Sequence, residues 1–270
     1  MTESLKIEIE GPIAQVILNR PEKANALDGE LWQALGKCFR DLDQNKSVRV
    51  CILSAEGKHF TAGIDLNLLQ EIGIQSEEYD CEGRKRDFLR RKILELQSSF
   101  SEFERCRKPV VAAIHGYCFG VGLEFCLACD FRIVTETALI GLPEQRIGMI
   151  PGSGGSIRLL HMIGLQRTKD MVMRSRRVTG PQACDWGIAL DCVTADSLDG
   201  AVAALVKELT QFSPLAQRTS KRILNEAQDA PLHVGIGLEG EAYGRLRSSH
   251  DFREGVEAFH EKRKADFNGT

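Results

Sequence analysis

The 270-residue sequence lacks the features of several large classes of protein. It has no apolar run of about 18 residues or more, which excludes a membrane-spanning helix. Its 35 Lys and Arg nearly balance 38 Asp and Glu, so the net charge of −3 provides no basic field for nucleic acid. The start of the chain carries acids and no apolar stretch. We therefore expect no signal or transit peptide, a cytoplasmic location, and neither membrane nor nucleic acid as a partner.

Motifs of nucleotide-binding, hydrolytic and metal-dependent enzymes are also missing. The glycine-rich segment 152–156 lacks the lysine of a P-loop, and no GxGxxG, GxSxG or HExxH motif occurs. Cys126 and Cys129 form a single CxxC pair, which fits one turn of a buried helix better than a zinc site. The nine cysteines are typical of reduced thiols in a cytosolic protein. We expect no metal.

The chain has the 43% hydrophobic content of a soluble globular protein and alternates strand-like with helix-like segments. The predicted strands and helices of this part are 13–18, 28–39, 48–53, 84–106, 109–114, 120–129 and 131–134. Such alternation favours an α/β layer with right-handed crossovers. After residue 197 only helical patterns follow. We predict an α/β region over 1–196 and a helical region over 197–270, which share one core.

Two glutamates lie in apolar segments. Glu124 stands among Leu123, Phe125 and Cys126, and Glu144 follows the apolar segment 140–143. Burying an ionised carboxylate is costly, and two half-buried carboxylates facing one pocket can serve as acid and base at neutral pH. The residues alone leave open a structural role for each glutamate, paired with an arginine or a helix N-terminus.

Several segments, in this order, resemble the crotonase superfamily, that is, the enoyl-CoA hydratases and isomerases. They are 18–27, 60–66, 108–117, 120–132, 143–144, 148–159 and 254–263. The resemblance implies an α/β fold in which a spiral of ββα turns is followed by a C-terminal helical trimerisation region. It also implies an acyl-CoA thioester substrate, with coenzyme A as part of the substrate and no separate cofactor, and a homotrimer or hexamer.

The resemblance also assigns roles to single residues. The backbone amides of Ile64 and Val121 would form an oxyanion hole for the thioester oxygen. Glu124 would act as the base on water, and Glu144 as the acid that protonates Cα. Position 121 departs from the family, which usually has glycine there, so the β-branched side chain of Val121 is expected to narrow the pocket or shift the amide.

A second group of residues resembles the family's substrate contacts. Those expected to bind coenzyme A or the acyl group are Lys23, Ala24, Ala26, Ala62, Asp65, Leu66, Gly141, Phe259 and Lys262. Phe259 and Lys262 would close the pocket from a neighbouring subunit. Helix packing for Phe259 and a solvated charge for Lys262 are the alternatives.

Two glutamates favour hydration, because simple isomerases of the family usually keep one carboxylate. The segment 148–155 is also hydratase-like, whereas 60–66 resembles the loop of dienoyl-CoA isomerases. Those isomerases have aspartates at the positions of Glu124 and Gly152. We therefore expect an enoyl-CoA hydratase that adds water across the 2,3 double bond. An enoyl-CoA or dienoyl-CoA isomerase and a non-catalytic acyl-CoA-binding homologue remain the alternatives.

Overall fold

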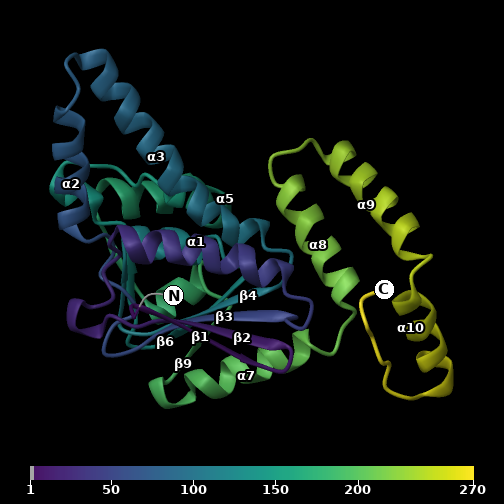
Figure 1. The fold of residues 1–270 in the computed structure, drawn as a ribbon. Helices are drawn as coiled ribbons and strands as arrows, with labels where there is room; N and C mark the ends of the chain where they lie inside the picture. Colours follow the sequence, from purple (N-terminus) through teal and green to yellow (C-terminus); the bar gives the residue numbers. More distant parts are fainter. Residues whose placement is uncertain (1–2) are drawn as a thin grey trace.

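The computed structural model describes residues 3–270 and contains two β-sheets in that range (Figure 1). The larger sheet has the strand order β1-β2-β3-β4-β6-β9. Its strands are β1 (Leu5–Glu10), β2 (Ile13–Leu18), β3 (Val50–Ala55), β4 (Val110–Ile114), β6 (Phe131–Thr135) and β9 (Asp191–Val193). Only β1 pairs antiparallel with its neighbour, and the other pairs are parallel.

Helices cover both faces of the larger sheet. Figure 1 shows α1 (Gly29–Gln44) and α3 (Glu82–Arg105) over one face and α7 (Leu198–Leu209) over the other. The alternation of β3 fits this arrangement, since Cys51 and Leu53 join the core cluster below α1, and Val50 and Ile52 join the cluster with α7. Strand β4 is buried along its whole length, as its continuous apolar run requires.

The small sheet holds the elements nearest to the two glutamates. It consists of β5 (Tyr117–Phe119), β7 (Leu139–Gly141) and β8 (Arg177–Thr179). Helix α4 (Val121–Leu127) begins directly after β5, and all of its residues are buried. The remaining elements of this part are η1 (Pro21–Lys23), α2 (Leu66–Glu77), η2 (Glu144–Ile147), α5 (Gly155–Met173), α6 (Gly180–Asp185) and η3 (Ala195–Ser197).

The last three helices lie beside the α/β part. They are α8 (Pro214–Ala227), α9 (Leu232–Leu246) and α10 (His250–Glu261), and Figure 1 shows α9 and α10 on the far side of α8 from the sheet. Buried Lys221 of α8 ties this part to the core through an ion pair with Asp130 at 2.7 Å. No helix within residues 3–270 has the length and apolar character needed to cross a membrane.

The strands and helices expected from the hydrophobic pattern are present, with ends shifted by a few residues. The pattern missed β1, the three-residue strands β5, β7, β8 and β9, and the helices α2, α5 and α6. Helix α7 belongs to the predicted helical region, which starts at residue 197. Its residues Leu198, Val202 and Val206 nevertheless pack against the sheet of the α/β region. The α/β part and the helical part thus share packing, and the division into two regions stays a prediction.

Candidate active site

Two glycine-containing turns lie against one another at the start of α4. Thr61 forms a β-bridge to Cys118, and the Phe119 amide donates to the Thr61 carbonyl at 3.2 Å. Gly63 has φ of 101° and Gly120 has φ of 56°. A Cβ on Gly63 would lie 2.9 Å from the Phe119 carbonyl oxygen, so a larger residue cannot occupy this position without displacing the backbone.

The amides of Ile64 and Val121 follow these two glycines. Within residues 3–270 neither N–H donates a hydrogen bond, although the neighbouring amides of Asp65 and Gly120 donate to the carbonyls of Leu27 and Gly141. Val121 is the first residue of α4, where an N–H has no acceptor within the helix. The turns therefore hold two backbone donors that are fixed and unpaired.

Glu124 is fully buried one helical turn after Gly120. Its Oε2 accepts hydrogen bonds from the amides of Ser153 and Gly155, both at 2.8 Å. Its Oε1 is buried without a partner among the described residues. A Cβ on Gly155 would lie 2.6 Å from Glu124 Cγ, so glycine permits this approach. Burial raises the pKa of Glu124, against the lowering effect of the amides and of Arg158.

Glu144 begins η2 and lies over the start of α4. A Cβ on Gly120 would lie 3.0 Å from Glu144 Oε1, so the carboxyl group stands next to that glycine. Both carboxyl oxygens are buried and make no hydrogen bond within residues 3–270. Burial, with a smaller contribution from the charge of Glu124, raises the pKa of Glu144 to about 7.

The two carboxyl groups are thus held differently. Backbone amides favour the ionised form of Glu124, whereas neither carboxyl oxygen of Glu144 accepts a hydrogen bond from another residue within 3–270, and the group faces a like charge. At neutral pH the pair is suited to hold one proton, with the charge on Glu124 and the proton on Glu144. Three buried carboxyl oxygens remain available to a water molecule or a substrate.

Comparisons with known proteins identify the family of the chain. A protein-family model described as enoyl-CoA hydratase/isomerase matches residues 8–270. The chain is 34% identical to the peroxisomal Delta(3,5)-Delta(2,4)-dienoyl-CoA isomerase of Arabidopsis thaliana, over 98% of this chain and 96% of the relative. It is also 34% identical to a carnitinyl-CoA dehydratase of Salmonella arizonae, over the full length of both. The chain belongs to the enoyl-CoA hydratase/isomerase family.

Solved structures of this family share the fold. The enoyl-CoA hydratase of Bacillus anthracis superposes with a TM-score of 0.88 at 29% identity, covering 99% of this chain and 100% of that chain. The resemblance to the crotonase superfamily and the expected α/β crotonase-like fold are therefore confirmed. So is the expectation that the chain is an enzyme of this family. Trimerisation stays a prediction.

The structure brings the four residues expected at the reaction centre together. Ile64, Val121, Glu124 and Glu144 all lie around the adjoining turns at the start of α4. The side chain of Val121 is 8% exposed and belongs to the hydrophobic core cluster, and its expected effect on the pocket stays a prediction. Gly141 takes part through its carbonyl, which accepts from the Gly120 amide at 2.9 Å.

Two of the residues expected to contact coenzyme A are joined to each other beside the turn of Gly63. The Ala62 amide donates to the Ala24 carbonyl at 2.8 Å, which joins the loop after η1 to the turn of Gly63. Asp65 caps α2 by accepting from the Asn67 amide at 3.1 Å, and Leu66 is 57% exposed. Lys23 is exposed, and Ala26 is half-buried.

Phe259 and Lys262 lie elsewhere in the single chain. Phe259 is 82% exposed on α10, in an apolar hollow lined by residues of α8, α9 and α10. Lys262 ends α10 in the left-handed conformation and is exposed. The chain does not bring either residue to its own glutamates, and contact from a neighbouring subunit stays a prediction.

The sequence analysis assigned no role to three residues that connect the parts of the site. Arg20 Nη1 donates to Asp65 at 2.9 Å and to the Ala26 carbonyl at 2.9 Å. Buried Asn25 donates to the carbonyls of Glu56 and His59, and its own carbonyl accepts from the Thr61 hydroxyl at 2.7 Å. These three residues lie within segments that resemble the family, and that position is the sequence feature that could have indicated a role for them.

The residues that the structure describes contain no cluster of side chains that could bind a metal ion. No group of three or more His, Cys, Asp or Glu side chains converges within residues 3–270. The Cys129 thiol contacts the Phe125 carbonyl at 3.5 Å, as in a helix, and Cys126 lies 3.9 Å from Cys118.

Proposed function

We propose that this protein is an enoyl-CoA hydratase, which adds water across the 2,3 double bond of an enoyl-CoA thioester. The observation that carries the proposal is the combination around α4 of three unpaired buried carboxyl oxygens with two unpaired backbone amides. Hydration needs a base for water, an acid for Cα and donors for the thioester oxygen, and these groups supply all three.

Glu124 acts as the base in this mechanism. The amides of Ser153 and Gly155 hold its Oε2, which leaves Oε1 to accept a proton from water. The water oxygen forms a bond to Cβ as its O–H bond breaks, and the electrons of the double bond move onto the thioester oxygen. The amides of Ile64 and Val121 stabilise this oxygen, by about 3 kcal/mol per donor.

Glu144 acts as the acid. Because its pKa is raised to about 7, a large share of its carboxyl groups is protonated at neutral pH. The enolate-like state takes this proton at Cα, which forms the C–H bond and leaves Glu144 ionised. Passage of the proton from Glu124 to Glu144 restores the starting state.

The coenzyme A part of the substrate is proposed to lie along Lys23, Ala24, Ala26, Ala62, Asp65 and Leu66. The backbone contact between Ala24 and Ala62 and the anchoring of Asp65 by Arg20 make this surface rigid before the substrate binds. Phe259 and Lys262 are proposed to reach the site of a second copy in a trimer, since both are exposed and remote within their own chain.

An enoyl-CoA or dienoyl-CoA isomerase is the second candidate, supported by the relative named as a dienoyl-CoA isomerase. The two candidates differ in their use of Glu144. A Glu144→Gln change should lower kcat for hydration by about 10²- to 10⁴-fold, because the group that protonates Cα is lost, yet it could spare an isomerase that relies on Glu124 alone. Conversion of 3-enoyl-CoA or 3,5-dienoyl-CoA by this variant would support the second candidate.

The test is a panel of 2-enoyl-CoAs, from crotonyl-CoA to long chains, with loss of the conjugated thioester absorbance as the readout. The wild-type protein should hydrate at least one member. Glu208→Gln is the matched control, because Glu208 is exposed on α7 at the opposite face of the sheet. Absence of turnover across the panel would reject hydration, and acyl-CoA affinity without turnover would support a binding protein.

A further inference from the structure

The turn that holds Glu124 is itself held from α3. Gln97 Nε2 donates to the Gly152 carbonyl at 2.6 Å. That carbonyl belongs to the same peptide group as the Ser153 N–H, which donates to Glu124 at 2.8 Å. Gln97, one planar peptide group and Glu124 are therefore joined in a single chain of hydrogen bonds.

The second amide that binds Glu124 is held in the same way by a different element. The Gly155 N–H shares its peptide group with the Gly154 carbonyl, which accepts from the Arg158 backbone amide at 3.0 Å. This bond belongs to the first turn of α5, so any residue other than proline at position 158 can form it. The bond to Gly152 depends on one side chain, that of Gln97.

Gly152 itself is exposed, and a Cβ built on it meets no atom within 4 Å. Gln97 therefore helps to orient the first peptide group of the turn from its carbonyl end, while the bond to Glu124 holds its N–H end. A donor on the carbonyl also polarises a peptide group, which makes its N–H a stronger donor.

We propose that Gln97 is a positioning residue that orients and polarises the Gly152–Ser153 peptide group and thereby sets the proton affinity of Glu124. Its kinetic consequence rests on the proposed role of Glu124 as the base. Loss of the Gln97 donor weakens the Ser153 bond to the carboxylate, so Glu124 binds its proton more tightly and is ionised less at neutral pH.

The charged groups around Glu124 allow this effect to be isolated. Glu144 faces it from η2 and Arg158 from α5, and Arg158 Nε pairs with Glu104 of α3 at 2.5 Å. Gln97 is neutral. A neutral substitution at this position changes the hydrogen bond and leaves the charges near Glu124 as they are.

The experiment compares Gln97→Met with Ser98→Ala in the full-length protein. Methionine keeps the length and helix propensity of glutamine without the donor. Ser98 is the neighbouring exposed residue, and its hydroxyl contacts only the Glu95 carbonyl of the same helix at 2.7 Å. Carbon-13 NMR of labelled glutamate carboxyls follows Glu124, whose signal is identified by its absence in Glu124→Gln.

We expect Gln97→Met to raise the pKa of Glu124 further and Ser98→Ala to leave it unchanged. With a substrate that the wild-type protein converts, Gln97→Met should lower kcat/KM about three- to tenfold and leave KM unchanged. The low-pH side of the kcat/KM profile should move to higher pH. A Glu124 titration in Gln97→Met that coincides with the wild type would overturn the proposal. Because the NMR titration needs no turnover, it decides this point even if hydration is rejected. Gln97→Ala provides the same test if the methionine variant does not fold.

Discussion

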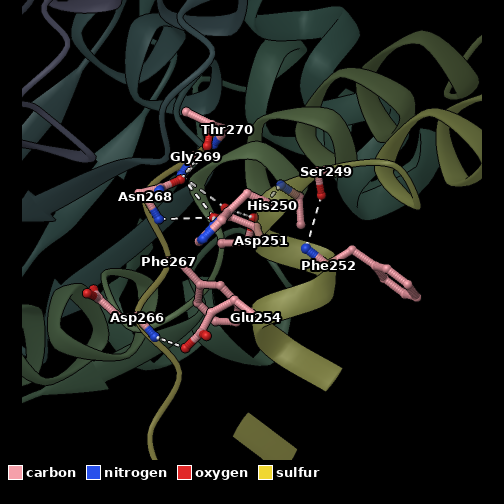
Figure 2. A network of polar contacts seen from close by, with 12 residues as sticks. Ser249, His250, Asp251, Phe252, Glu254, Asp266, Phe267, Asn268, Gly269 and Thr270 are labelled. Carbon is pink, nitrogen blue, oxygen red and sulfur yellow. Dashed lines mark hydrogen bonds and ion pairs between the residues drawn. The ribbon is translucent and has the colours of Figure 1, made fainter. Parts of the chain in front are cut away.

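Two buried carboxylates held by backbone amides show how differently this chain uses the same side-chain chemistry. Asp251 of α10 is 3% exposed and lies under the C-terminal segment 266–270 (Figure 2). Glu124 of α4 is fully buried under the turn of residues 152–155. Each carboxylate accepts hydrogen bonds from two backbone amides of a glycine-containing segment. The two differ in the other hydrogen bonds that their carboxyl oxygens accept.

Asp251 has both carboxyl oxygens occupied. Oδ1 accepts from the amides of Asn268 and Gly269 at 3.0 and 3.1 Å, and Oδ2 accepts from the Ser213 hydroxyl at 2.5 Å. Burial acts in the opposite direction, but the bonds from Ser213 and from these amides lower the pKa of Asp251. Figure 2 shows Asn268 and Gly269 beside the carboxyl group of Asp251.

Within residues 3–270, one carboxyl oxygen of Glu124 accepts hydrogen bonds and the other has no partner, and neither oxygen of Glu144 has one. Burial therefore outweighs hydrogen bonding, and the pKa of each is raised. A saturated carboxylate holds structure together, whereas an incompletely satisfied pair retains the ability to exchange protons. Incomplete satisfaction destabilises the folded state, and such a cost is typical of catalytic groups.

Asp251 and Glu144 also affect the pH dependence of stability with opposite signs. A lowered pKa means that Asp251 stabilises the fold above its unfolded pKa, and that this contribution is lost as pH falls through the folded value. A raised pKa means that Glu144 contributes stability at low pH, and that this is lost as pH rises from about 4.3 towards about 7.

The largest expected effect comes from neutralising the incompletely satisfied pair. Glu124→Gln and Glu144→Gln should each lower kcat for hydration by about 10²- to 10⁴-fold, because each removes one proton transfer. Glu124→Gln should at the same time raise the thermal midpoint at neutral pH, since it removes a buried charge. Steady-state kinetics and calorimetry on the same samples test this. A loss of both activity and stability would contradict the contrast with Asp251.

Asp251→Asn should have the reverse effect. It removes a charge that accepts several hydrogen bonds, so unfolding free energy should fall by about 1–3 kcal/mol. Urea unfolding at constant protein concentration measures this change. Below the transition kcat should stay at the wild-type level, and an undiminished stability would show that the network in Figure 2 is dispensable.

The pH dependence of kcat/KM follows from the shifted pair. The rate should fall at high pH as Glu144, with a pKa of about 7, loses the proton it must donate. It should also fall at low pH as Glu124 becomes protonated. The Glu208→Gln variant should show the same bell-shaped pH profile of kcat/KM as the wild-type protein. A rate that stays constant from pH 6 to about pH 9 would assign the acid to another group.

The smallest expected effect concerns Val121. Its side chain packs into the core while its N–H stays unpaired, so Val121→Gly should change kcat/KM by less than about threefold. The same change should lower the thermal midpoint, because a buried side chain is lost from a helix. A large gain in rate would show instead that the side chain obstructs the thioester.

The sequence allowed part of this account to be predicted. Helical periodicity placed the long helix α3 within two residues of its observed start, at Glu82 rather than 84. Helix α5 was missed because glycines precede it and Gly164 interrupts it with φ of 74°. Strands of three residues, such as β5, are too short to show alternation.

Part of the site could also be predicted from the sequence, and part could not. Family resemblance indicated Ile64, Val121, Glu124 and Glu144 residue by residue. It could not indicate Gln97, because the bond between Gln97 and Gly152 joins positions 55 apart and exists only once α3 has packed beside the turn. Nor did residue type separate Glu124 from Asp251, since only the folded structure shows how many donors each carboxylate receives.

The central claim is that the incompletely satisfied carboxylate pair adds water to an enoyl thioester. The most direct measurement is mass spectrometry of 2-enoyl-CoA products formed in water enriched in oxygen-18. We predict that the wild-type protein and Glu208→Gln form a 3-hydroxyacyl-CoA with one labelled oxygen at equal rates, and that Glu124→Gln forms it about 10²- to 10⁴-fold more slowly. Unlabelled product, or formation of labelled product by Glu124→Gln at the wild-type rate, would contradict the account.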